Sequence, residues 1–379
     1  GNDKSSDRRK SSLRILINHI MSVQTVIDDF IIKNAADLDN LPEYSGKEFA
    51  SDQDVRWCPG CGDYTILKQV QNAMPELGLA KKDIGFISGI GCSSRFPYYM
   101  DTFGMHSIHG RAPAIATGLK VSRSDLSVWI ITGDGDSLSI GANHFAQLLR
   151  RNVNVNLLLF NNQIYGLTKG QYSPASPEGS VTKSSPYGSI DHPFNPLAFS
   201  LGANGTFVAR AMDRDPKHLK EMILRSHQHN GASMLEIYQN CVVFNDGAFE
   251  LFTDKKSRPT EAIYLEDGEP LIFGKDKNKG IRLDGLRPEV VELGDQFSKD
   301  DLWVHDEKDQ TKAYLLSRFF EQNAAGSEEH FPRPFGVLYA EDKQTYDDGV
   351  NMQIAHAKET QGEADLDALL EGNETWEVK

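Results

Sequence analysis

An aspartate and an asparagine, about one crossover apart in the sequence, could together hold a divalent cation. Asp134 lies in a Gly-Asp-Gly-Asp run at 133–136, and Asn162 is the second residue of an Asn-Asn pair. Carboxylate and amide oxygens are hard donors that suit Mg²⁺ or Ca²⁺, and Mg²⁺ commonly bridges to a diphosphate. Gly133 and Gly135 would let backbone N–H groups approach the phosphate oxygens. The pattern therefore predicts a metal-bound diphosphate site.

Other phosphate-binding or catalytic motifs do not fit this run. A dinucleotide fingerprint needs Gly-x-Gly-x-x-Gly, but the third position is Leu138. The Gly-Lys-Ser/Thr of a Walker A loop is absent, and a nucleophile elbow fails because Ser139 stands two residues after Ser137. Taken alone, the run could still be an ordinary turn rich in glycine and aspartate.

The chain has four cysteines, Cys58, Cys61, Cys92 and Cys241, which are too few for a disulfide scaffold. The first two form a Cys-x-x-Cys, which can hold a metal centre or act as a redox pair. The other two follow predicted strands, whose ends should lie near Asp134. Four converging thiolates suggest a Cys₄ iron–sulfur cluster, with [4Fe–4S] the expected type. A structural zinc site and unrelated buried thiols are the alternatives.

A parallel α/β sheet would bring these residues together. Short apolar runs predict strands buried on both faces, at 84–88, 126–132, 155–160, 206–209 and 234–238. Helical patterns alternate with them, near 64–74, 112–121, 143–151 and 216–228. Parallel strands joined by a crossover place their carboxyl ends at one edge, where open α/β sheets bind ligands. Asp134 and Asn162 would share that edge.

Composition divides the chain into three parts. Residues 1–56 are polar and are expected to form an N-terminal arm, with an amphipathic stretch at 26–36. Residues 57–246 carry the α/β pattern and all the motifs. Residues 247–379 are charged and weakly periodic, so we expect a strand-poor C-terminal extension that ends in an acidic tail. The loop at 170–196 is long enough to be either functional or disordered.

The net charge and the hydropathy of the chain argue against some classes of partner. The 54 acidic and 40 basic residues give a formal net charge of −14, which argues against nucleic acid or an anionic membrane surface as a main partner. No run approaches the roughly 18 apolar residues that a membrane span needs. The first 20 residues make a poor signal peptide, because their apolar stretch is short and interrupted. We therefore expect a cytoplasmic protein.

Five stretches together resemble the β subunit of a 2-oxoacid:ferredoxin oxidoreductase. They are 57–64, 89–95, 109–112, 133–136 and 161–171, and the resemblance spans about 57–245, roughly half of the chain. The resemblance implies an open, mainly parallel sheet of the thiamine diphosphate-binding type. It also implies Mg²⁺ held by Asp134, Asn162 and the backbone carbonyl of Ile164. The cysteines would ligate a [4Fe–4S] cluster.

The same resemblance implies a reaction and its partners. A 2-oxoacid is decarboxylated on thiamine diphosphate, electrons leave singly through the cluster to ferredoxin, and the acyl group passes to coenzyme A. The reaction can run in reverse as a reductive carboxylation. No glutamate of the matched stretches can be assigned to cofactor activation, so an α subunit is expected to supply that carboxylate in an α₂β₂ assembly.

Individual roles also follow from the resemblance. His109 and Arg111 are expected to face the cofactor as catalytic residues. Further cofactor contacts are expected from Gly91, Ser93, Gly133, Gly135, Asp136, Gly166, Leu167 and Thr168. Arg95 and Lys169 could clamp a second carboxylate of the substrate, which favours 2-oxoglutarate, giving succinyl-CoA. Pyruvate or another 2-oxoacid is the alternative, as is a non-redox thiamine diphosphate subunit with a structural Cys₄ zinc site.

Overall fold

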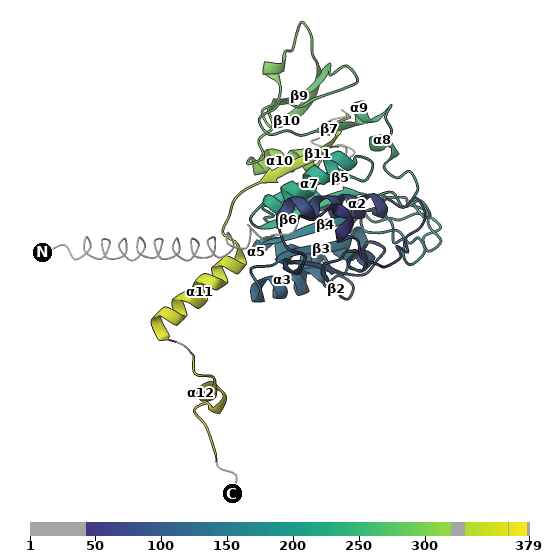
Figure 1. Cartoon of the computed structure of the whole chain (residues 1–379). Helices are drawn as coiled ribbons and strands as arrows, with labels where there is room; N and C mark the ends of the chain where they lie inside the picture. Colours follow the sequence, from purple (N-terminus) through teal and green to yellow (C-terminus); the bar gives the residue numbers. More distant parts are fainter. Residues whose placement is uncertain (1–42, 320–329, 363, 377–379) are drawn as a thin grey trace, which may run out of the picture. The chain divides into compact units, whose positions relative to one another are not determined.

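The computed structural model describes residues 43–319, 330–362 and 364–376 (Figure 1). Tyr44–Asp347 form one compact unit that carries the sheet. Helix α11 (Tyr346–Gln361) begins at its end and leads into a second unit, which also holds α12 (Leu366–Glu371). The amphipathic stretch at 26–36, and most of the expected N-terminal arm, lie outside the described residues.

An eight-stranded sheet in the order β2-β1-β3-β4-β6-β5-β11-β7 forms the centre of the first unit. Its neighbouring strands are all parallel except β5 and β11, which run antiparallel. The expected α/β class with a mainly parallel sheet is confirmed. The strands are β1 (Ile84–Ser88), β2 (Phe103–His106), β3 (Ser127–Gly133), β4 (Val155–Asn161), β5 (Phe207–Met212), β6 (Ala232–Tyr238), β7 (Ala262–Tyr264) and β11 (Arg333–Ala340).

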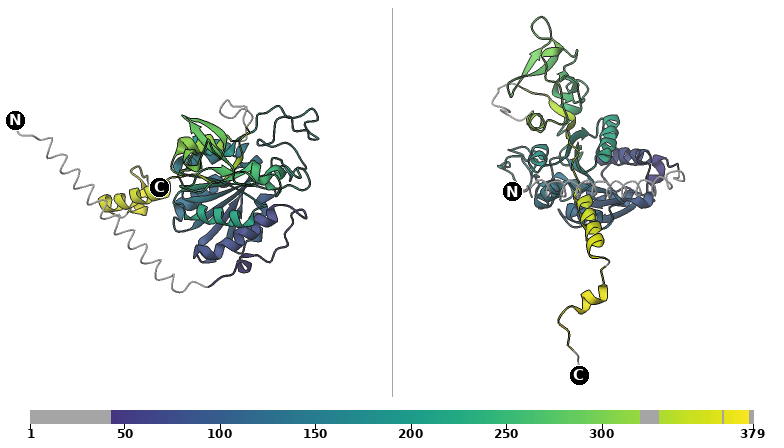
Figure 2. Two further views of the ribbon diagram at one scale, coloured as in Figure 1. Left: turned by 90° about the horizontal axis from the view of Figure 1, so that it is seen from above. Right: turned by 90° about the vertical axis from the view of Figure 1, so that its left-hand side faces the viewer.

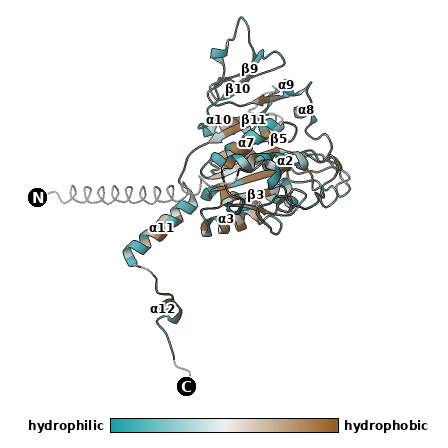
Figure 3. Ribbon diagram, viewed as in Figure 1, coloured by the Kyte–Doolittle hydropathy of each residue, from teal (hydrophilic) through white to brown (hydrophobic). Residues whose placement is uncertain are grey.

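Helices cover both faces of this sheet (Figure 2). Helices α2 (Asp63–Ala73) and α7 (Pro216–Gln228) pack on one face, against side chains such as Trp129. The other face is covered by α3 (Ala112–Ser122), α5 (Ala142–Arg151) and α6 (Pro196–Gly202). Apolar residues dominate the strands between these layers, as the brown ribbon of β3 shows (Figure 3). Strands β1, β4, β5 and β6 are buried along their whole length, which explains their uninterrupted apolar sequences.

Short helices complete the unit. The short α-helices are α4 (Asp134–Leu138), α8 (Glu250–Thr253), α9 (Arg258–Glu261) and α10 (Gln310–Ser317). The 3₁₀ helices are η1 (Gly46–Phe49), η2 (Met74–Leu77), η3 (Lys81–Asp83), η4 (Ser93–Tyr99) and η5 (Lys299–Asp301). Among the helices of the described part, none is long and apolar enough to cross a membrane.

The expectation that residues 247–379 are poor in strands is wrong. Strands β7 and β11 of this segment extend the main sheet, so the sheet continues past residue 246. Three more strands form a separate antiparallel sheet, β8 (Ile272–Phe273), β9 (Lys279–Asp284) and β10 (Arg287–Glu292). These strands do not show the apolar pattern of a buried strand, because charged residues stand on them. Arg282 of β9 and Glu289 of β10, for example, lie opposite each other and form an ion pair.

Candidate cofactor and metal site

The carboxyl ends of β1, β3, β4 and β6 carry the residues that the sequence singled out. The loops that follow these strands hold Cys92, Asp134, Asn162 and Cys241, in that order. One cavity of about 250 Å³ is lined by Asn162 and all four cysteines. The fold therefore gathers the thiols beside a predicted metal ligand, as expected from parallel strands that end at one edge.

Gly166 lies close to two of the sulfurs. A Cβ on this residue would lie 3.5 Å from the Sγ of Cys241 and 3.6 Å from the Sγ of Cys92. Cys61 accepts a hydrogen bond at its Sγ, with the donor Nε2 of Gln239 at 3.2 Å. Cys58 is the exposed member of the group. The thiols thus surround a space that side chains leave free.

The electrostatics of the thiols fit a cationic centre. Burial raises the pKa of Cys92 to about 12, and the charges of Asp63, Cys241 and Cys58 add to this effect. Burial also raises the pKa of Cys61, again with Asp63 and neighbouring cysteines adding to it. A bound metal deprotonates its cysteine ligands and offsets this repulsion. No group of three or more His, Cys, Asp or Glu side chains in the described ranges is arranged to hold a single metal ion.

Asp134 is buried at the start of α4, directly after β3. Burial raises its pKa to about 7, while the Ser173 hydroxyl and the backbone N–H groups of Gly135, Asp134 and Asn162 oppose this rise. Ser173 donates to its Oδ2 over 2.5 Å. A buried carboxylate of this kind fits a divalent cation, which would favour its charged form.

Asn162 is held by hydrogen bonds at several of its atoms. Its Oδ1 accepts from the backbone N–H of Ile164 over 3.2 Å, and its Nδ2 donates to Oε1 of Gln239 over 2.7 Å. The side chain of Asn245 donates to its carbonyl oxygen over 2.9 Å. Gln163, the next residue, has a left-handed backbone with φ of 56°. This turn brings Ile164 back towards the Asn162 side chain.

Sequence reasoning missed Gln239, although it stands two residues before Cys241. It follows β6 directly, is only 1% exposed and lines the thiol cavity. Its side chain contacts both Asn162 and Cys61. Its place at the end of a strand on the ligand-binding edge was the signal available from the sequence.

Asp136 was expected to contact the cofactor, but both of its carboxylate oxygens are occupied by contacts with other groups of the protein. Its Oδ1 accepts from the backbone N–H of Ile90 at 3.1 Å and of Gly110 at 2.7 Å, and lies 2.5 Å from Nδ1 of His109. Its Oδ2 accepts from the Thr132 hydroxyl at 2.7 Å. These contacts join the loops after β1 and β2 to the end of β3. The geometry gives Asp136 a positioning role.

Arg111 and the glycines nearby are also set by local contacts. The guanidinium of Arg111 donates from Nη1 to the carbonyls of His109 at 3.2 Å and Ile140 at 3.0 Å. These contacts with backbone carbonyls hold the arginine in place.

Gly135 is needed because a side chain would not fit at this position. A Cβ on Gly135 would lie 2.2 Å from the ring of Tyr165, whose hydroxyl donates to the Gly135 carbonyl over 3.0 Å. Only glycine fits there.

Two more expected cofactor contacts lie beside each other: Ser93 follows β1, and Gly133 is the last residue of β3. A Cβ on Gly133 would lie 3.6 Å from Oγ of Ser93, which is buried at the start of η4. Gly91 has a left-handed φ of 141° in the turn that leads to Cys92. This turn places Ser93 against the start of the Gly-Asp-Gly-Asp run.

Arg95 and Lys169, the expected substrate clamp, both line the thiol cavity. Arg95 donates from Nε to the Tyr99 hydroxyl over 3.0 Å. Lys169 is exposed and has a left-handed backbone with φ of 78°. Leu167 also lines this cavity, and it is exposed like Thr168. The structure thus brings the two cations to the same cavity.

The long loop at 170–196 reaches the metal site through serines. Besides the contact of Ser173 with Asp134, the Ser176 hydroxyl donates to the carbonyl of Gln163 over 2.6 Å. Ser173 and Ser176 are both buried. The start of this loop therefore contacts both Asp134 and the residue that follows Asn162.

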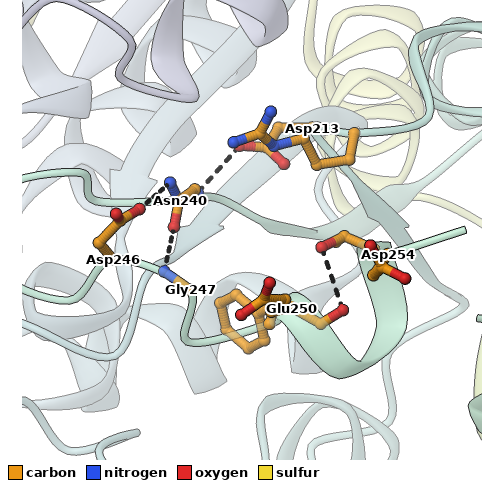
Figure 4. A pocket seen from close by; sticks show the side chains of 9 residues that line it. Asp213, Asn240, Asp246, Gly247, Glu250 and Asp254 are labelled. Carbon is orange, nitrogen blue, oxygen red and sulfur yellow. Dashed lines mark hydrogen bonds between the residues drawn. The ribbon is translucent and has the colours of Figure 1, made fainter. Parts of the chain in front are cut away.

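A second cavity of about 320 Å³ adjoins the chain segment that carries Cys241 (Figure 4). Asn240 organises its wall: its Nδ2 donates to Asp246 over 2.8 Å, and its Oδ1 accepts from the Gly247 backbone over 2.9 Å. The backbone N–H of Asn240 donates to Oδ2 of Asp213 over 2.9 Å. These bonds fix the backbone just before Cys241.

Comparison with known proteins finds relatives of this chain. Residues 89–237 match the family model of the thiamine pyrophosphate enzyme C-terminal TPP binding domain. The 2-oxoglutarate oxidoreductase subunit KorB of Mycobacterium tuberculosis is 50% identical over 356 residues, 92% of each chain. A 2-oxoacid:ferredoxin oxidoreductase subunit beta from Sulfolobus sp is 43% identical over 57% of this chain and 71% of its own.

A solved structure is also similar to this chain. It is the 2-oxoglutarate:ferredoxin oxidoreductase from Magnetococcus marinus with 2-oxoglutarate, coenzyme A and succinyl-CoA bound. The match has a TM-score of 0.67 and 33% identity, and covers 87% of this chain and 95% of the other. The expected resemblance is confirmed: the chain belongs to the family of 2-oxoacid:ferredoxin oxidoreductase β subunits.

Proposed function

We propose that this chain is the β subunit of a 2-oxoglutarate:ferredoxin oxidoreductase. The reaction is the oxidative decarboxylation of 2-oxoglutarate to succinyl-CoA, and it is reversible. The observation that carries the proposal is the shared cavity, in which four cysteines, Asn162 and the cations Arg95 and Lys169 meet. The KorB relative and the Magnetococcus marinus structure, both named for 2-oxoglutarate, favour this substrate over pyruvate.

Some residues of the chain would hold the metal, the cofactor and the cluster, and others would orient the reactants. Asp134, Asn162 and the carbonyl of Ile164 would hold Mg²⁺, and Gly133 and Gly135 would admit the diphosphate. Thiamine diphosphate supplies the electron sink for decarboxylation, and a [4Fe–4S] cluster on the cysteines supplies a one-electron exit.

Residues around this centre would orient the reactants. His109, fixed by Asp136, would present its free Nε2 to the cofactor, with Arg111 bracing the same turn. Arg95 and Lys169 would bind the second carboxylate of 2-oxoglutarate by charge-assisted hydrogen bonds. A substrate without that carboxylate, such as pyruvate, would leave both cations unpaired.

The partners are an α subunit, in an α₂β₂ complex, and a ferredoxin. An exposed apolar surface beside the site supports the first: Phe103 on the edge strand β2 is 68% exposed, and Ile108 after it is 70% exposed. Open edge strands and apolar patches of this kind are commonly covered by a partner. The four cysteines of the chain serve one cluster, so the next electron carrier is a separate protein. A low-potential cluster needs a reducing setting, for which we propose the cytoplasm.

The test is an anaerobic assay of the complete αβ complex. Reduction of a ferredoxin should require both 2-oxoglutarate and coenzyme A, and should stop when thiamine diphosphate and Mg²⁺ are removed. Pyruvate in place of 2-oxoglutarate should support much slower reduction. Equal rates with the two acids would contradict the substrate, and reduction without coenzyme A would contradict the reaction.

A further inference from the structure

Gln239 connects the two parts of the site, and we propose that it is a positioning residue that tunes both. It holds the metal ligand Asn162 in place, and it raises the reduction potential of the cluster through an N–H bond to Cys61. This inference rests on the proposed function, because it requires a cluster at the cysteines. The residue is 1% exposed and its backbone N–H donates to the Asn161 carbonyl over 3.0 Å.

The hydrogen bonds fix which way the Gln239 amide points. The backbone N–H of Ile164 donates to Oδ1 of Asn162, so Nδ2 of Asn162 must face Gln239. That Nδ2 donates to Oε1 of Gln239 over 2.7 Å. The Nε2 of Gln239 then donates to the Asn240 carbonyl over 2.7 Å and to Sγ of Cys61 over 3.2 Å. A flipped amide would set oxygen against oxygen at Asn240 and nitrogen against nitrogen at Asn162.

An unbroken chain of donors therefore runs from the metal ligand to the thiol. An N–H that points at a ligating sulfur stabilises its negative charge, and the reduced cluster carries one electron more than the oxidised one. The bond thus stabilises the reduced state more and raises the reduction potential. On the other side, Oε1 of Gln239 orients the amide of Asn162 towards the metal. Residues that orient ligands in this way typically change metal affinity when they are replaced.

The experiment uses the complete αβ complex with Gln239→Leu and Gln239→Met, which fill the space but donate no N–H. Gln71→Leu is the matched control, because Gln71 is buried and donates to the Tyr99 carbonyl over 3.2 Å, away from Cys61 and Asn162. The reduction potential of the cluster is measured by an EPR-monitored redox titration. Thiamine diphosphate affinity is measured by calorimetry in the presence of Mg²⁺.

Both Gln239 variants should shift the potential to more negative values and weaken thiamine diphosphate binding on the order of tenfold, while Gln71→Leu changes neither. Variants that hold a cluster at the wild-type potential overturn the inference. If neither variant assembles a cluster while Gln71→Leu does, the residue serves assembly and the tuning role is wrong. A wild-type complex without a cluster would instead overturn the proposed function itself.

Discussion

Asp136, which is buried, and His109, which is partly exposed, form a carboxylate–imidazole pair in which Oδ1 of the aspartate lies 2.5 Å from Nδ1 of the histidine. The same oxygen already accepts two backbone N–H bonds, from Ile90 and Gly110, so the histidine nitrogen acts as the donor. This fixes the tautomer and leaves Nε2 of His109 as the free atom of the ring. Loops that follow two different strands are thereby held in one arrangement beside the metal site.

Replacing Asp136 with asparagine should therefore loosen both the loops and the histidine. The amide offers one accepting oxygen where the carboxylate offers two, so at least one donor loses its partner. We expect a loss of about 1–3 kcal/mol in the free energy of unfolding and a fall in kcat on the order of a hundredfold. Chemical denaturation and steady-state kinetics of the complex measure the two effects. Asp52→Asn, an exposed change, is the control; a fully active, stable Asp136→Asn enzyme would refute the positioning role.

Gly166→Ala should separate folding from cluster binding. The added methyl would meet the sulfurs of Cys241 and Cys92 at 3.5 and 3.6 Å, which is ordinary contact for the polypeptide but adds a carbon directly beside both sulfurs. We expect stability to stay within about 1 kcal/mol of the wild type, with bound iron and visible absorbance reduced on the order of tenfold. Iron analysis of the purified complex measures the loss.

Gly118→Ala is the matched control, because a Cβ there meets no atom within 4 Å. This helix position should gain about 0.5–1 kcal/mol and keep its iron. A full iron content in Gly166→Ala would show that the space between the sulfurs is not the cluster site.

Lys169→Gly tests the substrate clamp. The left-handed backbone of Lys169, with φ of 78°, suits glycine, so the fold should tolerate the change. Loss of a charge-assisted bond to the second carboxylate should lower kcat/KM for 2-oxoglutarate by about ten- to a hundredfold. The value for pyruvate should change little. Lys183→Gly removes another exposed lysine from the following loop as a control; unchanged 2-oxoglutarate turnover in Lys169→Gly means that no clamp exists there.

Acid should destabilise the chain through His227. Its ring stacks on Trp129 at 5.8 Å between centroids, and burial lowers its pKa below 6.5, aided by the charge of Lys120. As the pH falls below 6.5, the unfolded chain binds a proton that the folded chain resists, so stability is lost. His227→Phe keeps the stack and should make unfolding less dependent on pH between about 7.5 and 5.5.

Denaturation curves at a series of pH values measure this dependence. His192→Phe, a change at an exposed histidine, should leave it almost unaltered. Identical pH dependence in the wild type and His227→Phe would show that this ring does not titrate with unfolding.

Most of the central sheet could be predicted from the sequence, because its buried strands are uninterrupted apolar runs. The run at 84–88 and the helix pattern at 216–228 match β1 and α7 residue for residue. Strand β2 was missed because it is short, lies at the sheet edge and is exposed throughout. Strands β9 and β10 were missed because charged residues pair across them.

For the site, residue types predicted which side chains lie at the edge of the sheet, but not which atoms they contact. Asp136 was expected at the cofactor, and its contact with His109 depends on the three-dimensional meeting of two loops. Gln239 was not anticipated, because its partners Asn162 and Cys61 are far from it in the sequence. Such long-range hydrogen bonds leave no periodic pattern in a sequence.

The most direct test of the account is one anaerobic visible spectrum of the αβ complex, combined with metal and sulfide analysis. A [4Fe–4S] cluster on Cys58, Cys61, Cys92 and Cys241 predicts a brown protein with about four iron and four sulfide per β subunit, bleached by 2-oxoglutarate with coenzyme A. A colourless protein that contains zinc at these cysteines would contradict the central claim.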